Sequence, residues 1–170
     1  MRNGLIGITF SITLFAGMEA SAAGAEDPPF VTARILSLES ANQVALGAAR
    51  ACRRQGYQVA VAVTDRYGNL LAFVRDPLAG AHTITIARHK AYTAATFQGA
   101  TLELADRLKF LKGTPQVSLV GGGVPVRIGG YIYGAVGVSG APQKKIPGDV
   151  DDACARAGIA AVEEVLEFGG

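Results

Sequence analysis

The chain has 170 residues, which suits one ordinary domain, and 49% of them are hydrophobic against 18% charged. This balance excludes an intrinsically disordered chain, and the 22 glycines follow no Gly-x-y period, which excludes collagen. The formal net charge is only +2 and aromatic residues make up 7%, so the chain lacks a dense basic patch and a supply of stacking rings. We therefore expect no nucleic-acid partner.

Residues 1–25 have the three parts of a secretory signal peptide. Arg2 provides the positive start, residues 5–18 are apolar, and small residues form two cleavage sites at 20–22 and 23–25. The apolar stretch is shorter than the roughly 20 residues that a membrane helix needs. The sequence therefore predicts a periplasmic or secreted protein with no membrane span once the leader is removed. An uncleaved membrane anchor is the alternative interpretation.

The first predicted element follows an N-terminal extension at residues 26–36. Ser37 is its expected N-cap and Gly56 its expected end. Apolar side chains recur between them at helical spacing, at Ala41, Val44, Ala45, Ala48 and Cys52. A hairpin is then predicted, with strands at 59–64 and 70–75 joined by the turn residues 65–69.

After the first hairpin the sequence predicts two helices, a second hairpin and a last helix. A helix is predicted over 81–96, and a short helix with Thr101 as N-cap follows to about Lys109. Short strands are predicted at 117–120, 124–128 and 131–139, with the tight turn at Gly129-Gly130. Asp149 is the expected N-cap of a last helix whose apolar stripe extends to Phe168.

Two hairpins imply antiparallel strand pairing, so the predicted class is α+β: an antiparallel sheet of about five strands with helices packed on its faces. The sequence predicts one domain over residues 37–170, since no internal repeat or linker divides it. The two cysteines, Cys52 and Cys154, fall on the apolar faces of the first and last helices. In an oxidising compartment they are able to form a disulfide; two buried free thiols are the alternative.

The helix predicted over 81–96 carries most of the candidate site residues. His82 and His89 lie on nearly the same side but about 10 Å apart along a straight helix, too far to ligate one metal ion together. Arg88 and Lys90 flank His89, and the three form a basic corner able to bind ligand carboxylates; a solvated helix face is the alternative. Lys90 shares a side of the helix with apolar Ile86, so this cation needs a partner.

Other common motifs are absent from the sequence. Gly121-Gly122-Gly123 precedes a strand pattern, so no helix N-terminus follows to receive a phosphate. The sequence contains no Cys-x-x-Cys, His-Glu-x-x-His, Gly-x-Ser-x-Gly or Walker pattern. Hydrolase, zinc-enzyme and nucleotidase functions therefore have no motif in support.

Several blocks, in family order across the expected mature chain, resemble the GlcG/HbpS family of haem-binding proteins. They are Val59 to Leu70 (VAVAVTDRYGNL), Ala87 to Ala94 (ARHKAYTA), Thr101 to Leu104 (TLEL), Gly122 to Val126 (GGVPV), Gly134 to Gly140 (GAVGVSG) and Asp151 to Ala155 (DDACA). The resemblance implies a profilin-like fold and a homo-oligomer. It also implies haem as ligand, with storage, buffering, sensing or degradation of haem as the role, and it leaves enzymatic activity open.

The resemblance also implies a haem ligand. In the exported haem-binding member of the family a threonine ligates the iron, and the matching residue here is Thr101. The residue before it is commonly proline and is Ala100 here, and glutamates proposed to bind iron elsewhere in the family have no match, since Thr85 and Arg88 stand nearby. His82 and His89 are the other candidate ligands, and Arg88 and Lys90 are available for the propionates. The alternative role of Thr101 is that of an ordinary helix cap.

A second function of a different class is an enzyme, or an enzyme accessory, acting on a small hydroxy acid or related metabolite. In that hypothesis Lys90 and Tyr92 serve as acid and base, and Arg88 holds the carboxylate.

Overall fold

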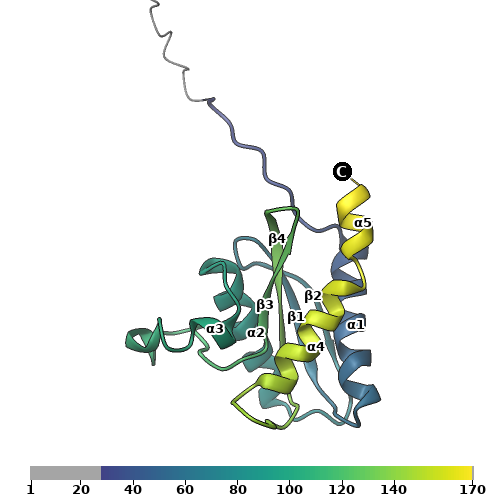
Figure 1. Cartoon of the computed structure of the whole chain (residues 1–170), viewed down its shortest axis with the longest axis vertical. Helices are drawn as coiled ribbons and strands as arrows, with labels where there is room; N and C mark the ends of the chain where they lie inside the picture. The colour runs from purple at the N-terminus through teal and green to yellow at the C-terminus, as the bar shows by residue number, and fades with distance from the viewer. Residues whose placement is uncertain (1–27, 170) are drawn as a thin grey trace, which may run out of the picture. The chain divides into compact units, whose positions relative to one another are not determined.

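The computed structural model describes residues 28–169. The predicted leader at 1–25 lies outside the described residues. From Ala33 onward the chain forms one compact unit, whose elements Figure 1 labels. No helix in the described part combines the length and the apolar character that crossing a bilayer requires.

A sheet of four antiparallel strands forms the centre of this unit, in the order β2-β1-β4-β3. Its strands are β1 (Ala60–Asp65), β2 (Leu70–Arg75), β3 (Gly123–Ile128) and β4 (Tyr131–Ser139). The two predicted hairpins, β1-β2 and β3-β4, are therefore present, and β1 pairs with β4 to join them. Asp65 fixes the first turn because its carboxylate accepts the N–H groups of Tyr67 and Asn69, and Gly129 and Gly130 adopt the positive φ that the second turn needs.

One face of the sheet, here called the valine face, is covered by α1 (Leu38–Arg54) and α4 (Asp149–Ala160). It presents seven buried valines, at Val59, Val61, Val63, Val124, Val126, Val136 and Val138. Ser37 caps α1 as predicted, accepting the N–H of Ser40. A disulfide between Cys52 and Cys154 joins α1 to α4, which is the first of the two interpretations of these cysteines.

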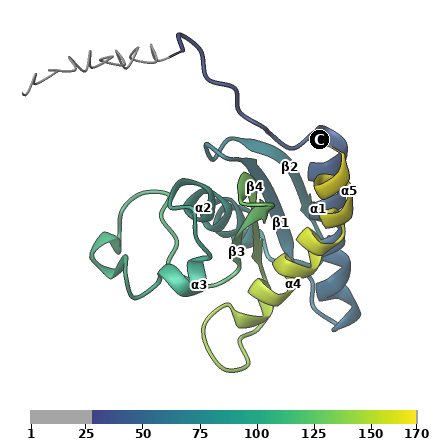
Figure 2. The same ribbon diagram turned by 45° about the horizontal axis from the view of Figure 1, so that its top comes forward.

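The other face, here called the alanine face, is covered by α2 (His82–Thr96), as Figure 2 shows. Alanines from both sides meet there, at Ala60, Ala62, Ala87, Ala91, Ala94, Ala95 and Ala135. Gly137 allows the helix to approach, because a Cβ at this position would overlap the carbonyl oxygen of Ala87. Small side chains thus hold α2 close against β1 and β4.

The prediction of about five strands is wrong by one, because residues 117–120 form no strand. The backbone of this segment bonds to side chains instead of to a neighbouring strand. The N–H of Ser118 donates to the hydroxyl of Thr93, and the carbonyl of Val120 accepts from the hydroxyl of Thr101. The hydroxyls of Thr93 and Thr101 therefore form hydrogen bonds with backbone groups that a neighbouring strand would otherwise pair.

Several predicted helix bounds also differ, and the short helix ends at Leu104, not near Lys109. The short helix α3 (Thr101–Leu104) has Ala100 as its N-cap, so Thr101 is not the cap. A single-turn 3-10 helix, η1 (Lys109–Leu111), follows it. Gly148 is the N-cap of α4, while the carboxylate of Asp149 accepts N–H groups of the preceding loop. The last helix divides at Val162, after which α5 (Glu163–Phe168) begins.

Candidate functional site

The outer side of α2 borders two hollows in the surface. The first, here called the polar hollow, has a volume of about 190 Å³. Its lining comes from α2, from the β1-β2 hairpin and from the loop before β3: Thr64, Gly68, Leu70, Thr85, Arg88, His89, Tyr92 and Gln116. Gly68 matters here because a Cβ on it would meet the ring of Tyr92. The hairpin turn and α2 are thus in direct contact beside the hollow.

The polar hollow brings together Arg88 and His89, two of the three residues of the predicted basic corner, and adds Tyr92. A guanidinium binds a carboxylate or phosphate through paired hydrogen bonds, and an imidazole transfers a proton or ligates a metal. A phenol donates or accepts a hydrogen bond. This set of groups suits an anionic ligand, and it also offers one nitrogen donor for an iron.

Lys90 is the exception within the predicted basic corner, because it points away from the polar hollow and is only 1% exposed. Its ammonium donates to the carboxylate of Asp151 at 2.8 Å and to the carbonyl of Val138 at 2.9 Å. The sequence prediction that this cation needs a partner is confirmed. Burial lowers the pKa of Lys90 and raises the pKa of Asp151, and the attraction between the two charges opposes both changes.

The second hollow, here called the Lys90 hollow, has a volume of about 330 Å³. His82 lies on its rim, and Lys90 and Asp151 form part of its lining. The structure therefore places His82 and His89 at different hollows, in line with their spacing along the helix. It also separates Lys90 from Tyr92, so these two residues do not form the acid–base pair of the enzyme hypothesis.

Thr101 is fully buried. Its hydroxyl donates to the carbonyl of Val120 at 2.8 Å and accepts the N–H of Gly123 at 2.9 Å. These bonds tie the start of α3 to the start of β3. The hydroxyl would have to give up both partners to approach an iron.

The fit of haem to these residues follows from size and chemistry. Pockets that enclose a cofactor-sized ligand occupy roughly 300–1,000 Å³, and the polar hollow is smaller. It does offer a partly exposed imidazole from His89 beside the guanidinium of Arg88, which fits an iron ligand next to a propionate site. The residues thus fit haem held on the surface of α2 rather than enclosed. Within residues 28–169, His, Cys, Asp and Glu side chains form no group of three suited to a bare metal ion.

Several site residues escaped the sequence analysis. Asp151 lies within one of the family blocks, and nothing in the sequence indicates that it pairs with a lysine 61 positions away. Thr64 and Gln116 reach the polar hollow from a strand end and a loop, and local patterns do not predict such contacts. The one usable signal was the need of Lys90 for a counter-charge.

Comparison with known proteins gives a consistent result. A family model described as haem-degrading protein HbpS-like matches residues 36–160. The protein GlcG of Escherichia coli K12 is 33% identical over 110 residues, which cover 62% of this chain and 81% of GlcG. An uncharacterised 15.0 kDa protein of Citrobacter freundii is 34% identical over 90 residues, covering 48% of this chain and 63% of that protein.

Solved structures agree with the sequence matches. The crystal structure of a double mutant of HbpS from Streptomyces reticuli is 37% identical, with a TM-score of 0.73, and the match covers 84% of this chain and 97% of that one. The structure of a PduOC–haem complex is 27% identical, with a TM-score of 0.65, and the match covers 75% of this chain and 94% of that one. Both share the sheet with helices on its faces.

Proposed function

Since the chain belongs to the HbpS-like family of haem-degrading proteins, we propose that it binds haem on the outer side of α2. The observation that carries the proposal is the meeting of Arg88 and His89 at the polar hollow. The solved haem complex of the similar protein PduOC supports the same ligand.

In this proposal each residue has a separate task. His89 ligates the iron through its imidazole, and Arg88 binds a propionate carboxylate. Thr101 acts at a distance by fixing the loop between α3 and β3. Bound haem supplies an iron centre, and its surface position suits storage, buffering or sensing of haem better than electron transfer.

We further propose that the protein acts outside the cytosol, as a periplasmic or secreted protein, and as a homo-oligomer. The disulfide between Cys52 and Cys154 supports export, because such bonds persist in oxidising compartments. Mass spectrometry of the protein recovered from the periplasm or the medium tests it: the expected chain lacks residues 1–25. A chain that keeps its leader and stays with the cytosolic fraction contradicts export.

Titration of ferric haem into the purified protein tests the main proposal. A Soret band that saturates near one haem per chain, or one per pair of chains, is the expected result. Absence of saturable binding at micromolar haem overturns it.

Four variants then assign the ligand. His89→Ala is expected to shift the Soret band and weaken binding, and Arg88→Gln to weaken binding without changing the ligand spectrum. His82→Ala, at the Lys90 hollow, serves as the matched control and is expected to bind as the wild type does. Thr101→Val removes the hydroxyl and is also expected to leave the spectrum unchanged. If His82→Ala changes the spectrum and His89→Ala does not, the iron site belongs to the Lys90 hollow.

A second candidate function is an enzyme or enzyme accessory for a small hydroxy acid. The volume and polarity of the polar hollow favour it, since Arg88 would hold the carboxylate with His89 or Tyr92 as proton donor or acceptor. Thermal denaturation with haem and with a panel of small hydroxy acids separates the two functions, because a ligand specific for the folded state raises the melting temperature. A shift with a hydroxy acid that Arg88→Gln abolishes, and none with haem, would establish the second function.

A further inference from the structure

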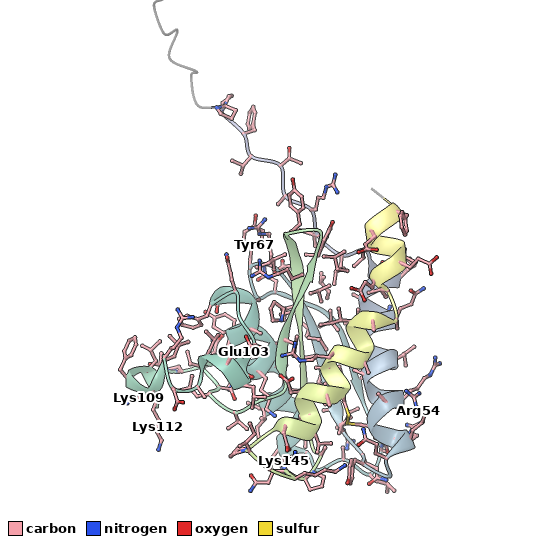
Figure 3. The ribbon with its side chains drawn as sticks, viewed as in Figure 1. Arg54, Tyr67, Glu103, Lys109, Lys112 and Lys145 are labelled. Atoms are coloured by element: carbon pink, nitrogen blue, oxygen red, sulfur yellow. A yellow bond between two sulfur atoms is a disulfide. The ribbon has the colours of Figure 1, made fainter. Side chains whose placement is uncertain are left out.

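The segment after α3 projects from the rest of the domain and carries an apolar depression. Figure 3 shows Lys109 and Lys112 at the end of this projection. The depression, here called the apolar hollow, has a volume of about 360 Å³, and its apolar lining comes from Ala105, Val117, Leu119 and Val120. Lys109 and Lys112 also line it, so an apolar floor is bordered by two cations.

The helix α5 has the opposite character. Val162 and Leu166 hold it against the valine-face core, the first fully and the second partly buried. Phe168 is left 82% exposed, and Val165 is also exposed. Every charged residue of α5 is acidic: Glu163, Glu164 and Glu167. An exposed aromatic ring therefore stands on a helix whose charged residues are all acidic.

These two surfaces complement each other but do not meet within one chain. Figures 1 and 2 both place α5 and the projecting segment on opposite sides of the domain. Glu164 precedes Phe168 by one helical turn, so its carboxylate lies on the same side of α5 as the ring. Glu167 lies about 100° around the helix from Phe168, on the flank of that side. Aromatic anchors in apolar pockets with charged rims are the usual arrangement at protein interfaces.

We propose that Phe168 of one copy of the chain inserts into the apolar hollow of a second copy, with Glu164 and Glu167 facing Lys109 and Lys112. Each copy offers one apolar hollow and one α5, so the contact is heterologous and joins copies head to tail. The rim charges set the orientation and the specificity of this contact, and the phenyl ring supplies its buried apolar area.

Reciprocal charge reversal tests the contact by sedimentation velocity of the purified protein without haem. The wild type is expected to associate at about 100 μM, where a contact of micromolar affinity is saturated. Lys109→Glu with Lys112→Glu, and separately Glu164→Lys with Glu167→Lys, are each expected to weaken association by about tenfold or more. Phe168→Ala is expected to weaken it similarly. Each charge-reversed protein alone is therefore expected to associate more weakly than the wild type across a concentration series, but a mixture of the two is expected to associate as the wild type does.

Arg54→Glu with Lys145→Glu is the matched control, since it reverses two exposed cations on another part of the surface (Figure 3). It is expected to associate normally. A wild type that sediments as a single chain overturns the proposal, and so does a mixture that fails to recover association. Vesicles of phosphatidylserine and phosphatidylcholine test the competing occupant. If reversal of Lys109 and Lys112 abolishes vesicle binding and leaves association unchanged, the apolar hollow faces a lipid surface instead.

Discussion

The two faces of the sheet differ in the size of their side chains, although the same strands build both. On β1, Val61 and Val63 point to the valine face, while Ala60 and Ala62 point to the alanine face. Large side chains and a disulfide make the valine face the main source of buried apolar area. Small side chains bring α2 close on the alanine face, and the basic and imidazole groups stand on the outer side of that helix. Stability and the candidate site are thus assigned to opposite faces.

The largest expected effect comes from removing the disulfide that joins the two helices on the valine face. Cys52→Ala with Cys154→Ala is expected to lower the free energy of unfolding by about 4–5 kcal/mol, because a bond across a sequence separation of 102 restricts the unfolded chain strongly. Urea denaturation measures the loss, and reduction of the wild type is the control. Ligand binding at the polar hollow is expected to persist below the unfolding transition. An unchanged free energy of unfolding would show that the disulfide does not stabilise the fold.

The ion pair that links the two helical layers comes next. Asp151→Ala leaves the ammonium of Lys90 buried with only the carbonyl of Val138, and we expect a loss of about 3–4 kcal/mol. Asp151→Leu combined with Lys90→Met removes both charges and is expected to recover most of that loss. Chemical denaturation compares the three proteins. A double variant as unstable as Asp151→Ala would show that packing, and not the unpaired charge, sets the cost.

Close packing on the alanine face is tested by Gly137→Ala. The added methyl overlaps the carbonyl of Ala87, so α2 must move outward, at a cost of about 1–3 kcal/mol. Val138→Ala, which faces the valine side, is the control: it is expected to lose stability through a cavity while α2 stays in place. Only Gly137→Ala is therefore expected to weaken ligand binding at the polar hollow. Equal binding by both variants would break the assignment of the site to this face.

The structural role of Thr101 predicts a smaller effect. Thr101→Val leaves the N–H of Gly123 and the carbonyl of Val120 without their partner, and a loss of about 1–2 kcal/mol follows. Thr101→Ser keeps the hydroxyl and is the control, with stability close to the wild type. Thermal denaturation without haem distinguishes this role from iron ligation, which has no effect in the absence of haem.

The smallest expected effect concerns acid pH. Hydrogen bonds from the backbone N–H groups of Lys144 and Lys145 hold the pKa of Asp149 below its usual value of 3.8. The folded-state pKa is the lower one, so this stabilisation is complete above pH 3.8 and is lost as the pH falls through the folded-state value. Melting temperatures across that range are expected to fall more steeply for the wild type than for Asp149→Asn. Equal slopes of melting temperature against pH for the two proteins would exclude a contribution of the Asp149 carboxylate to stability.

Much of the fold was predictable because turn and cap residues in the sequence mark where its helices and strands begin and end. The turn at 65–69 and the pair Gly129-Gly130 locate both hairpins, and Ser37 locates the start of α1. The missing strand at 117–120 shows where this reasoning fails. A β-rich run normally predicts a strand, but hydroxyls of Thr93 and Thr101 take its backbone groups, and they belong to other elements.

The candidate site was predictable only where one helix supplies it. Arg88 and His89 are consecutive residues of α2, so the sequence itself indicated that they lie beside each other. Lys90 belongs to the same run of charges, yet it turns inward to Asp151, since an acidic partner on α4 was available across the edge of the sheet. Local periodicity describes which side of a helix a residue occupies, and it does not identify the element that packs there.

The disulfide also determines what a single cut in the chain would release. Cys52 and Cys154 close a covalent ring that contains all four strands, α2 and the projecting segment with Lys109 and Lys112. A protease that cleaves that exposed segment would therefore release no fragment until the sulfur bridge is reduced. On a gel without reductant the nicked chain would keep its mass, and with reductant it would separate into two pieces, each carrying one of the hairpins.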